Sequence, residues 1–220
     1  MTEYLKIFNT VSEYDAVVGT DNEPSVSHVI ESNGVEFKEP DPYCGHEYVD
    51  LGLPSGTKWA KTNIGASSET EYGIYYDYGK GKRDYTMTSG ETAYTGTENP
   101  LASSADTATL LWGSKWHIPT RVQFQELTAN TNCELLSNGY KFINKNDSSK
   151  YIILPYSGYY QRGSSSLLAT GSRGIYISSN SFSYNEVVPY MLEFVKYSMW
   201  NNGCNSGYSD RITPIRPVTQ

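Results

Sequence analysis

Three cysteines and three histidines are the residues whose side chains could perform nucleophilic, redox or metal chemistry. They are Cys44, Cys133, Cys204, His28, His46 and His117. They form neither a Cys-x-x-Cys pair nor a histidine pair four positions apart, which are patterns typical of zinc sites. The sequence also contains no Gly-rich phosphate loop and no nucleophile elbow. These residues therefore predict a protein that is not an enzyme and that uses no metal or cofactor.

Residues 156–208 favour a different chemistry, which is molecular recognition. Of these 53 residues, 8 are Tyr, 11 Ser, 6 Gly and 5 Asn, whereas only 5 are charged. Antibody combining sites have a similar composition, because Tyr supplies contact area at low entropic cost and small polar residues supply adaptable hydrogen bonds. A Tyr/Ser-rich β-domain with merely polar loops fits the composition as well, so both interpretations stay open here.

The end of this region supplies the candidate contact residues. Residues 190–195 alternate like a half-buried strand. The alternation places Tyr190, Leu192 and Phe194 inward and Met191, Glu193 and Val195 outward. Residues 199–208 mix large apolar side chains with loop formers, and exposed apolar clusters often mark contact sites. We expect ligand contacts from Ile175, Asn180, Phe182, Tyr184, Val187, Met191, Met199, Trp200, Asn202, Cys204, Asn205 and Tyr208.

Two helices and several strands must position these residues. We expect one helix capped by Ser104, with Ala105, Ala108 and Leu111–Trp112 on one face. A second helix follows Pro119, with Thr120 and Gln123 at capping-box spacing and Val122, Phe124 and Leu127 as apolar positions. Residues 140–143 and 151–155 read as strands around a polar turn, and further short strands follow. This order predicts an α+β fold.

An acidic N-terminal segment precedes this body. Residues 1–43 contain two lysines and nine acidic residues, whereas residues 44–220 are balanced in charge. The segment has signals for a short helix near residues 12–18 and for a hairpin around Ser32-Asn33-Gly34. We interpret residues 1–43 as an attachment or assembly segment, with a mobile leader as the alternative. The neutral body disfavours nucleic acid as a partner, and no apolar run is long enough to insert into a membrane.

Several separated blocks carry a family resemblance. They include Leu51-Gly52-Leu53-Pro54-Ser55-Gly56, Trp116-His117-Ile118-Pro119-Thr120, Gly174-Ile175-Tyr176-Ile177-Ser178-Ser179 and Ile215-Arg216-Pro217-Val218. In this order, over roughly residues 46–218, the blocks resemble the major paralogous domain family of Fibrobacter and Bacteroides-type bacteria and their phages. That family resembles the formylglycine-generating-enzyme subtype of the C-type lectin fold. It includes variable proteins of diversity-generating retroelements.

The resemblance implies a ligand-binding domain over residues 44–220, with a variable region at about 156–210. Formylglycine-generating enzymes need a pair of neighbouring cysteines in their C-terminal part, whereas this chain has Cys204 alone there. Calcium-dependent C-type lectins carry Glu-Pro-Asn and Trp-Asn-Asp motifs, whereas Glu98-Asn99-Pro100 is scrambled and Trp200-Asn201-Asn202 lacks the carboxylate. Calcium prefers several oxygen ligands, and acids are scarce here. Both comparisons favour binding without catalysis and without metal.

We therefore expect a receptor-binding protein of a phage, with a bacterial surface protein or glycan as its partner. The start of the chain lacks the pattern of a secretion signal, which favours a virion component folded in the cytoplasm. A bacterial surface adhesin and a virion decoration domain without a specific ligand are the alternatives. Weak single contacts would gain from multivalency, so a homotrimer, or attachment to a virion through residues 1–43, fits this hypothesis.

Overall fold

The computed structural model describes residues 43–80, 93–184, 186–196, 204 and 207–220, without the side chains of residues 183 and 184. The chain divides into two compact units, Met1–Gly45 and His46–Gln220. The helix and hairpin expected within residues 1–43 lie outside the described residues and stay predictions, as does the role of that segment. The second unit contains the helices and strands that the structure describes.

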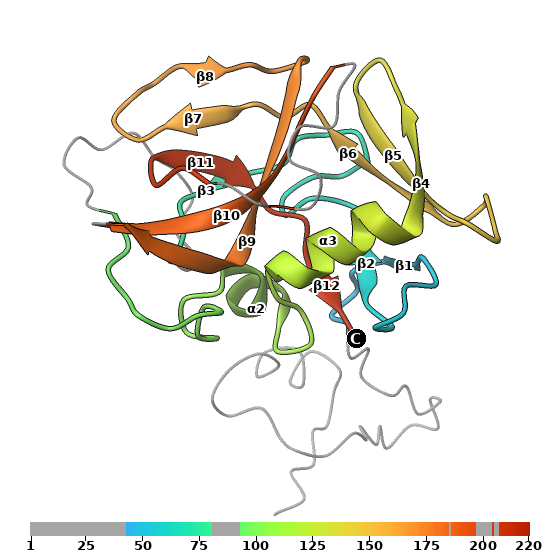
Figure 1. The fold of residues 1–220 in the computed structure, drawn as a ribbon, viewed down its shortest axis with the longest axis horizontal. Coiled ribbons are helices and arrows are strands. Elements are labelled where there is room, and N and C mark those ends of the chain that lie inside the picture. The colour runs from blue at the N-terminus through green and yellow to red at the C-terminus, as the bar shows by residue number, and fades with distance from the viewer. Residues whose placement is uncertain (1–42, 81–92, 185, 197–203, 205–206) are drawn as a thin grey trace, which may run out of the picture. The chain divides into compact units, whose positions relative to one another are not determined.

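This unit is an α+β fold of two helices and many short antiparallel strands in separate open sheets (Figure 1). The helices are α2 (Thr107–Trp112) and α3 (Arg121–Asn130). The strands before and just after the helices are β1 (Tyr48–Asp50), β2 (Lys58–Ala60), β3 (Tyr75–Tyr76), β4 (Thr131–Leu135), β5 (Gly139–Asn144) and β6 (Tyr151–Pro155). The remaining strands are β7 (Tyr159–Gln161), β8 (Leu167–Leu168), β9 (Arg173–Tyr184), β10 (Glu186–Val195), β11 (Arg211–Pro214) and β12 (Val218–Thr219).

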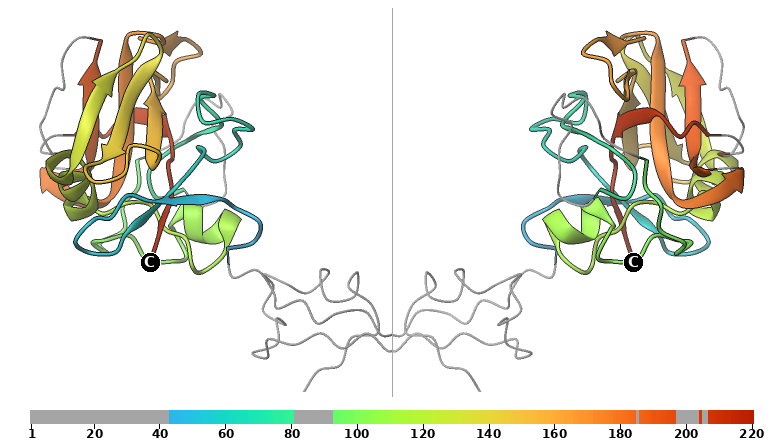
Figure 2. Two further views of the ribbon diagram at one scale, coloured as in Figure 1. Left: turned by 90° about the vertical axis from the view of Figure 1, so that its right-hand side faces the viewer. Right: turned by 90° about the vertical axis from the view of Figure 1, so that its left-hand side faces the viewer.

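Over the described residues these strands form four antiparallel sheets, with strand orders β1-β2-β12, β3-β11-β7-β8, β4-β5-β6 and β10-β9. The last strand closes the unit, because Val218 pairs with Trp59 of β2 and bridges to His117 ahead of α3. Figure 2 accordingly places the C-terminus beside the blue β1–β2 pair. Within the described residues, no helix combines the length and apolarity needed to cross a membrane.

The predicted helices are confirmed with corrections at their caps and faces. Asp106, not Ser104, caps α2, and its carboxylate accepts a hydrogen bond from the Thr109 amide at 2.9 Å. At α3 the expected capping box between Thr120 and Gln123 is present. The exposed faces differ from expectation: Val122 is 68% exposed and Leu111 38% exposed. Both point to solvent because a short helix can bury only one narrow stripe.

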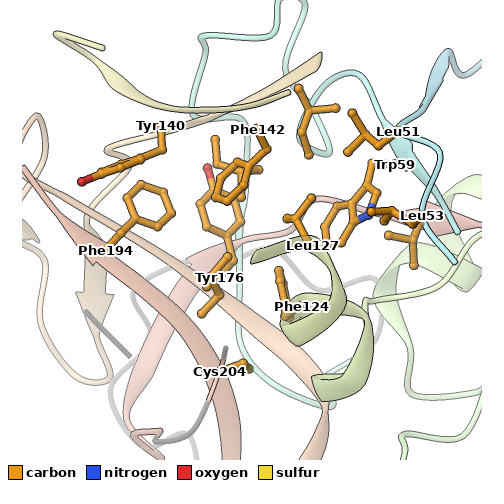
Figure 3. Packing of buried hydrophobic residues seen from close by; sticks show 14 of the residues in the cluster. Leu51, Leu53, Trp59, Phe124, Leu127, Tyr140, Phe142, Tyr176, Phe194 and Cys204 are labelled. Atoms are coloured by element: carbon orange, nitrogen blue, oxygen red, sulfur yellow. The ribbon is translucent and has the colours of Figure 1, made fainter. Parts of the chain in front are cut away.

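The hydrophobic core joins α3 to three of the sheets (Figure 3). Phe124 and Leu127 of α3 are fully buried, and Trp59 packs on Phe124 with ring centroids 5.4 Å apart. Phe194 of β10 contacts Tyr140 of β5 at 5.2 Å between ring centroids. These contacts fix the long β9–β10 hairpin against the helix and the β4–β6 sheet.

A buried polar cluster, formed by Arg216, Asn63 and Tyr176 and here called the polar hub, joins segments far apart in the sequence. The Arg216 guanidinium donates to Asn63 Oδ1 at 2.8 Å, to the Ile153 carbonyl at 2.8 Å, and to the carbonyls of residues 60 and 61 at 3.2 and 3.1 Å. Asn63 in turn donates to the Tyr72 carbonyl at 2.9 Å. Burial lowers the pKa of Arg216 to about 10, so the side chain stays charged at neutral pH.

We predict that Arg216→Met destabilises the unit by about 3 kcal/mol, because it leaves several buried carbonyls and an amide without their donor. Urea unfolding followed by tryptophan fluorescence measures this change, since all four tryptophans lie after residue 46. Lys61→Met is the matched control: Lys61 forms an exposed ion pair with Glu47, and such pairs add little stability. Equal stability of the two variants would contradict the prediction.

Candidate functional site

The turn end of the β9–β10 hairpin projects from a rigid base. At the base, Tyr176, Leu192 and Phe194 are all fully buried in the core. Towards the turn the strands become accessible: Phe182 and Val187 are half-buried, and Glu186 is exposed. The register shifts between Pro189 and Met191, which bends the ribbon at that point. A fixed base with an accessible tip is an arrangement suited to presenting side chains.

Residues 93–99 lie along this tip and are fastened to it by the Asn99 carboxamide. Asn99 Oδ1 accepts from Asn180 Nδ2 at 2.9 Å and from the Ser181 amide at 3.1 Å. Asn99 Nδ2 donates to the Ser181 carbonyl at 2.7 Å. The Leu101 amide adds a hydrogen bond to the Ser179 carbonyl at 2.9 Å. The segment is therefore held beside β9 in a defined position.

Tyr78 and Tyr94 support this segment from within. The Tyr78 hydroxyl donates to the Ser179 carbonyl at 2.9 Å, and its ring meets Tyr94 edge-on at 5.6 Å between centroids. Burial raises the pKa of Tyr78 to about 12, so the hydroxyl remains a donor at physiological pH. A side chain at Gly79, where φ is +69°, would overlap the Tyr94 ring, so this position needs glycine, whereas one at Gly96 would require the hydroxyl end of Tyr94 to move.

A cleft of about 460 Å³ opens between the two segments, and we call it the hairpin cleft. Its lining is Ala93, Tyr94, Thr95, Gly96, Thr97, Asn99, Ser181, Phe182, Glu186 and Val187. Its volume lies in the range of small-ligand sites. The described lining contains aromatic, aliphatic and hydroxyl groups with one carboxylate. The described residues contain no cluster of His, Cys, Asp or Glu able to hold a metal ion. The arrangement can bind a group that combines apolar and polar parts.

Arg121, the first residue of α3, fixes the β9–β10 hairpin against the helix. Its guanidinium lies 4.2 Å from the centre of the Tyr190 ring, and that ring contacts Phe182 at 5.0 Å between centroids. The Arg121 backbone amide donates to Asn180 Oδ1 at 3.0 Å, and its Nε donates to the Cys204 carbonyl at 3.2 Å. One residue thus links the helix, the hairpin and the segment before β11.

A second aromatic group lies near the start of β11. The Arg211 guanidinium lies 3.6 Å from the centre of the Tyr159 ring and 4.5 Å from that of Tyr208. The adjacent Ser209 hydroxyl donates to Glu186 Oε1 at 2.6 Å, which connects this group to the hairpin tip. Tyr208 itself is 40% exposed.

The structure brings some of the predicted contact residues together. Phe182 and Val187 line the hairpin cleft, and Asn180 holds its edge through Asn99. Tyr208 is exposed next to the Ser209 link, as expected for a contact residue. The side chain of Tyr184 and all of Met199, Trp200, Asn202 and Asn205 lie outside the described residues, so these assignments stay predictions.

The prediction of outward-facing contacts is wrong for Ile175, Met191 and Cys204, which are 0%, 1% and 0% exposed. The prediction from the alternating pattern assumed that one side of β10 faces solvent, but both sides are buried over residues 191–194. Even Glu193, expected outward, is buried, and Arg173 Nη1 lies 3.1 Å from its Oε1. Burial raises the pKa of Glu193 despite this cation.

Cys204 needs a separate explanation, because its neighbours in sequence are loop formers. Its side chain belongs to the core cluster, close to Phe124 and Tyr176 in Figure 3, and its backbone adopts a positive φ of 63°. A small apolar thiol suits a narrow space in such a core. Burial raises the pKa of the thiol, so it is neither a contact group nor a reactive one.

The 93–99 side of the cleft was not predicted from the sequence. Tyr94-Thr95-Gly96-Thr97 has the same recognition-type composition as the C-terminal region, but it lies outside the stretch where that composition is continuous. The available signal was Asn99, a residue with a carboxamide beside Pro100 in a segment without periodicity.

Comparisons with known proteins give no assignment. No family model, no curated protein and no solved structure matches this chain.

We predict that Cys204 resists alkylation in the folded protein, whereas Cys44 and Cys133 react, because only Cys204 is buried. Mass spectrometry after iodoacetamide treatment distinguishes the three sites by peptide. Denaturant should make Cys204 react at a rate similar to that of Cys44. Rapid native labelling of Cys204 would show that the core does not enclose it.

Proposed function

We propose that this chain is a non-enzymatic receptor-binding protein that uses the hairpin cleft and the adjoining Tyr208 surface. The observation that carries the proposal is the cleft itself, an open space of about 460 Å³ with mixed aromatic and polar lining at the tip of a rigidly based hairpin. Preorganised side chains bind at low entropic cost, since little needs to be ordered on association. Phe182 and Val187, both half-buried at the tip, would provide the apolar contact area.

The scaffold we propose is a C-type lectin fold of the formylglycine-generating-enzyme subtype. Sequence resemblance implied this fold, and the two helices with short antiparallel strands before and after them are compatible with it. In the same proposal, the chain is a variable protein of a diversity-generating retroelement, carried on a phage particle and directed at a bacterial surface molecule. A bacterial surface adhesin would use the same surface from a different location.

The arrangement of buried and exposed residues supports diversification in particular. Residues at the tip make few core contacts, whereas those at the base of the hairpin are fully buried. Substitution at the tip therefore changes the surface without a large cost to folding. A decoration domain without a ligand would have no need for a hairpin with a buried base and a tip that tolerates substitution.

We predict that a variant with Phe182→Ala and Val187→Ala binds its target bacteria at least about tenfold more weakly, because it loses central apolar contacts. Binding of labelled protein to a panel of Bacteroides-type strains measures the effect, with the unchanged chain identifying the strains that respond. Thermal unfolding should shift little, since both side chains are half-buried. Leu135→Ala removes an apolar side chain that is more exposed, at 42%, from β4 and serves as the control for loss of apolar surface elsewhere. Unchanged binding by the double variant would overturn the proposed site.

We also predict where natural variation falls. Sequencing this gene from many members of its source population should show adenine-biased changes at codons 180, 182, 187 and 208. Of these, codon 180 should vary least, because the Asn180 carboxamide bonds to Asn99 and to the Arg121 amide. Codons 176, 192, 194 and 204 should remain constant, because their side chains fill the core. Variation spread evenly along the gene, or none at all, would favour a decoration domain over a diversified receptor-binding protein.

A further inference from the structure

Glu186 supplies the negative charge of the described part of the hairpin cleft. Among the described lining residues it is the single carboxylate, and none of the others is Lys, Arg or His. Arg162, which is outside that lining and paired with Asp77, acts on Glu186 only through space. Its Oε1 accepts the Ser209 hydroxyl at 2.6 Å, which orients the carboxylate. No hydrogen bond to Oε2 is present within the described part of the chain. The cleft thus offers an exposed, oriented and negative acceptor to an incoming group.

The rest of the lining suits the methylene groups of a long side chain. Ala93, Val187 and the ring of Phe182 supply apolar contacts, and the contact between Phe182 and Tyr190 fixes the ring. Lysine and arginine bury their stems on apolar surface while keeping the charged head at a polar rim. The cleft has this combination, with an apolar wall and a carboxylate beside it.

A sugar ligand fits the same cleft less well. Sugar hydroxyls are recognised by planar polar groups that are free to accept and donate together. Asn99 is the carboxamide in the lining, and its oxygen already accepts twice while its nitrogen donates to Ser181. The Tyr94 ring is engaged with Tyr78 and packed between two glycines. The described lining therefore leaves the Glu186 carboxylate as its free planar polar group, and a carboxylate accepts hydrogen bonds but cannot donate them.

We propose that the hairpin cleft is a subsite for one lysine or arginine side chain presented by a protein receptor. The inference rests on the proposed function, since it assigns chemistry to part of the same surface. The stem of the basic side chain lies against Phe182 and Val187, and its charged head pairs with Glu186. Charge complementarity of this kind contributes specificity and rate of association more than affinity.

The probe for this subsite is the capped peptide acetyl-Gly-Lys-Gly-amide, titrated into the 15N-labelled full chain and followed by NMR. The amides of Gly96, Ser181 and Val187 are expected to shift, with weak affinity that falls as salt is added. The same peptide with norleucine in place of lysine keeps the stem and removes the charge, so it should bind about threefold to fivefold more weakly.

Two matched variants separate a direct ion pair from general electrostatics. Glu186→Gln should weaken binding of the lysine peptide about threefold to fivefold, to the level of the norleucine peptide. Glu98→Gln removes the same charge from a neighbouring exposed residue outside the described lining and should leave affinity unchanged. Glu98 Oε2 accepts a 3.4 Å hydrogen bond from the Tyr94 hydroxyl, which a glutamine carbonyl can also accept. An equal effect of both variants would show that only the local potential matters, and would overturn the subsite.

The remaining outcomes are equally decisive. Equal binding of the lysine and norleucine peptides, or no shift with either, overturns the inference. Shifts at the same amides with methyl glucoside but not with the lysine peptide assign the cleft to a glycan instead. In each case, loss of bacterial binding by the Phe182/Val187 double variant still supports the proposed function. Conversely, lysine-peptide binding combined with unaffected bacterial binding by that variant leaves the subsite standing and rejects the proposed function.

Discussion

A buried guanidinium without a carboxylate partner holds the centre of the main unit together. The hydrogen bonds of Arg216 go to amide oxygens from β2, the loop after it and β6, and Glu69 acts on it only through space. Removing such a charge from water costs several kcal/mol, which only complete hydrogen bonding offsets. The backbone segments that supply these acceptors must therefore be in place together, which favours a single arrangement of the sheets.

The polar hub also determines where the binding surface can be. Tyr176 of β9 lies within reach of Asn63 Nδ2 at 3.4 Å and donates to the Pro155 carbonyl at 3.3 Å, so the base of the hairpin is joined to the hub. Its partner in the register, Leu192, is buried in the same core. Towards the turn, the hairpin becomes accessible after Ser179 on β9 and at Val187 and Glu186 on β10, where these constraints end. The cleft forms at that point, beside the segment that Asn99 fastens.

Local signals in the sequence predicted local structure well. The capping box at Thr120 and the strands around residues 144–150 are present as expected, because hydrogen bonds between near neighbours determine them. Alternation could not predict whether the second side of β10 faces solvent, because the sequence does not show that other residues cover Met191 and Glu193. The prediction that Cys204 faces outward was wrong for the same reason: its burial depends on core residues that lie far away in the sequence.

The 93–99 side of the hairpin cleft could not be predicted from the sequence, because the cleft is assembled from two segments that are far apart in the chain. Composition can identify a stretch rich in recognition residues, but it cannot tell which other stretch will lie beside it. That pairing depends on three hydrogen bonds of one carboxamide and on a buried tyrosine hydroxyl. If the tip is diversified, Asn99 and Tyr78 must be kept constant while Phe182 and Val187 vary. Asn99 and Tyr78 form hydrogen bonds mainly with backbone atoms, so they can hold the cleft in place when its lining side chains change.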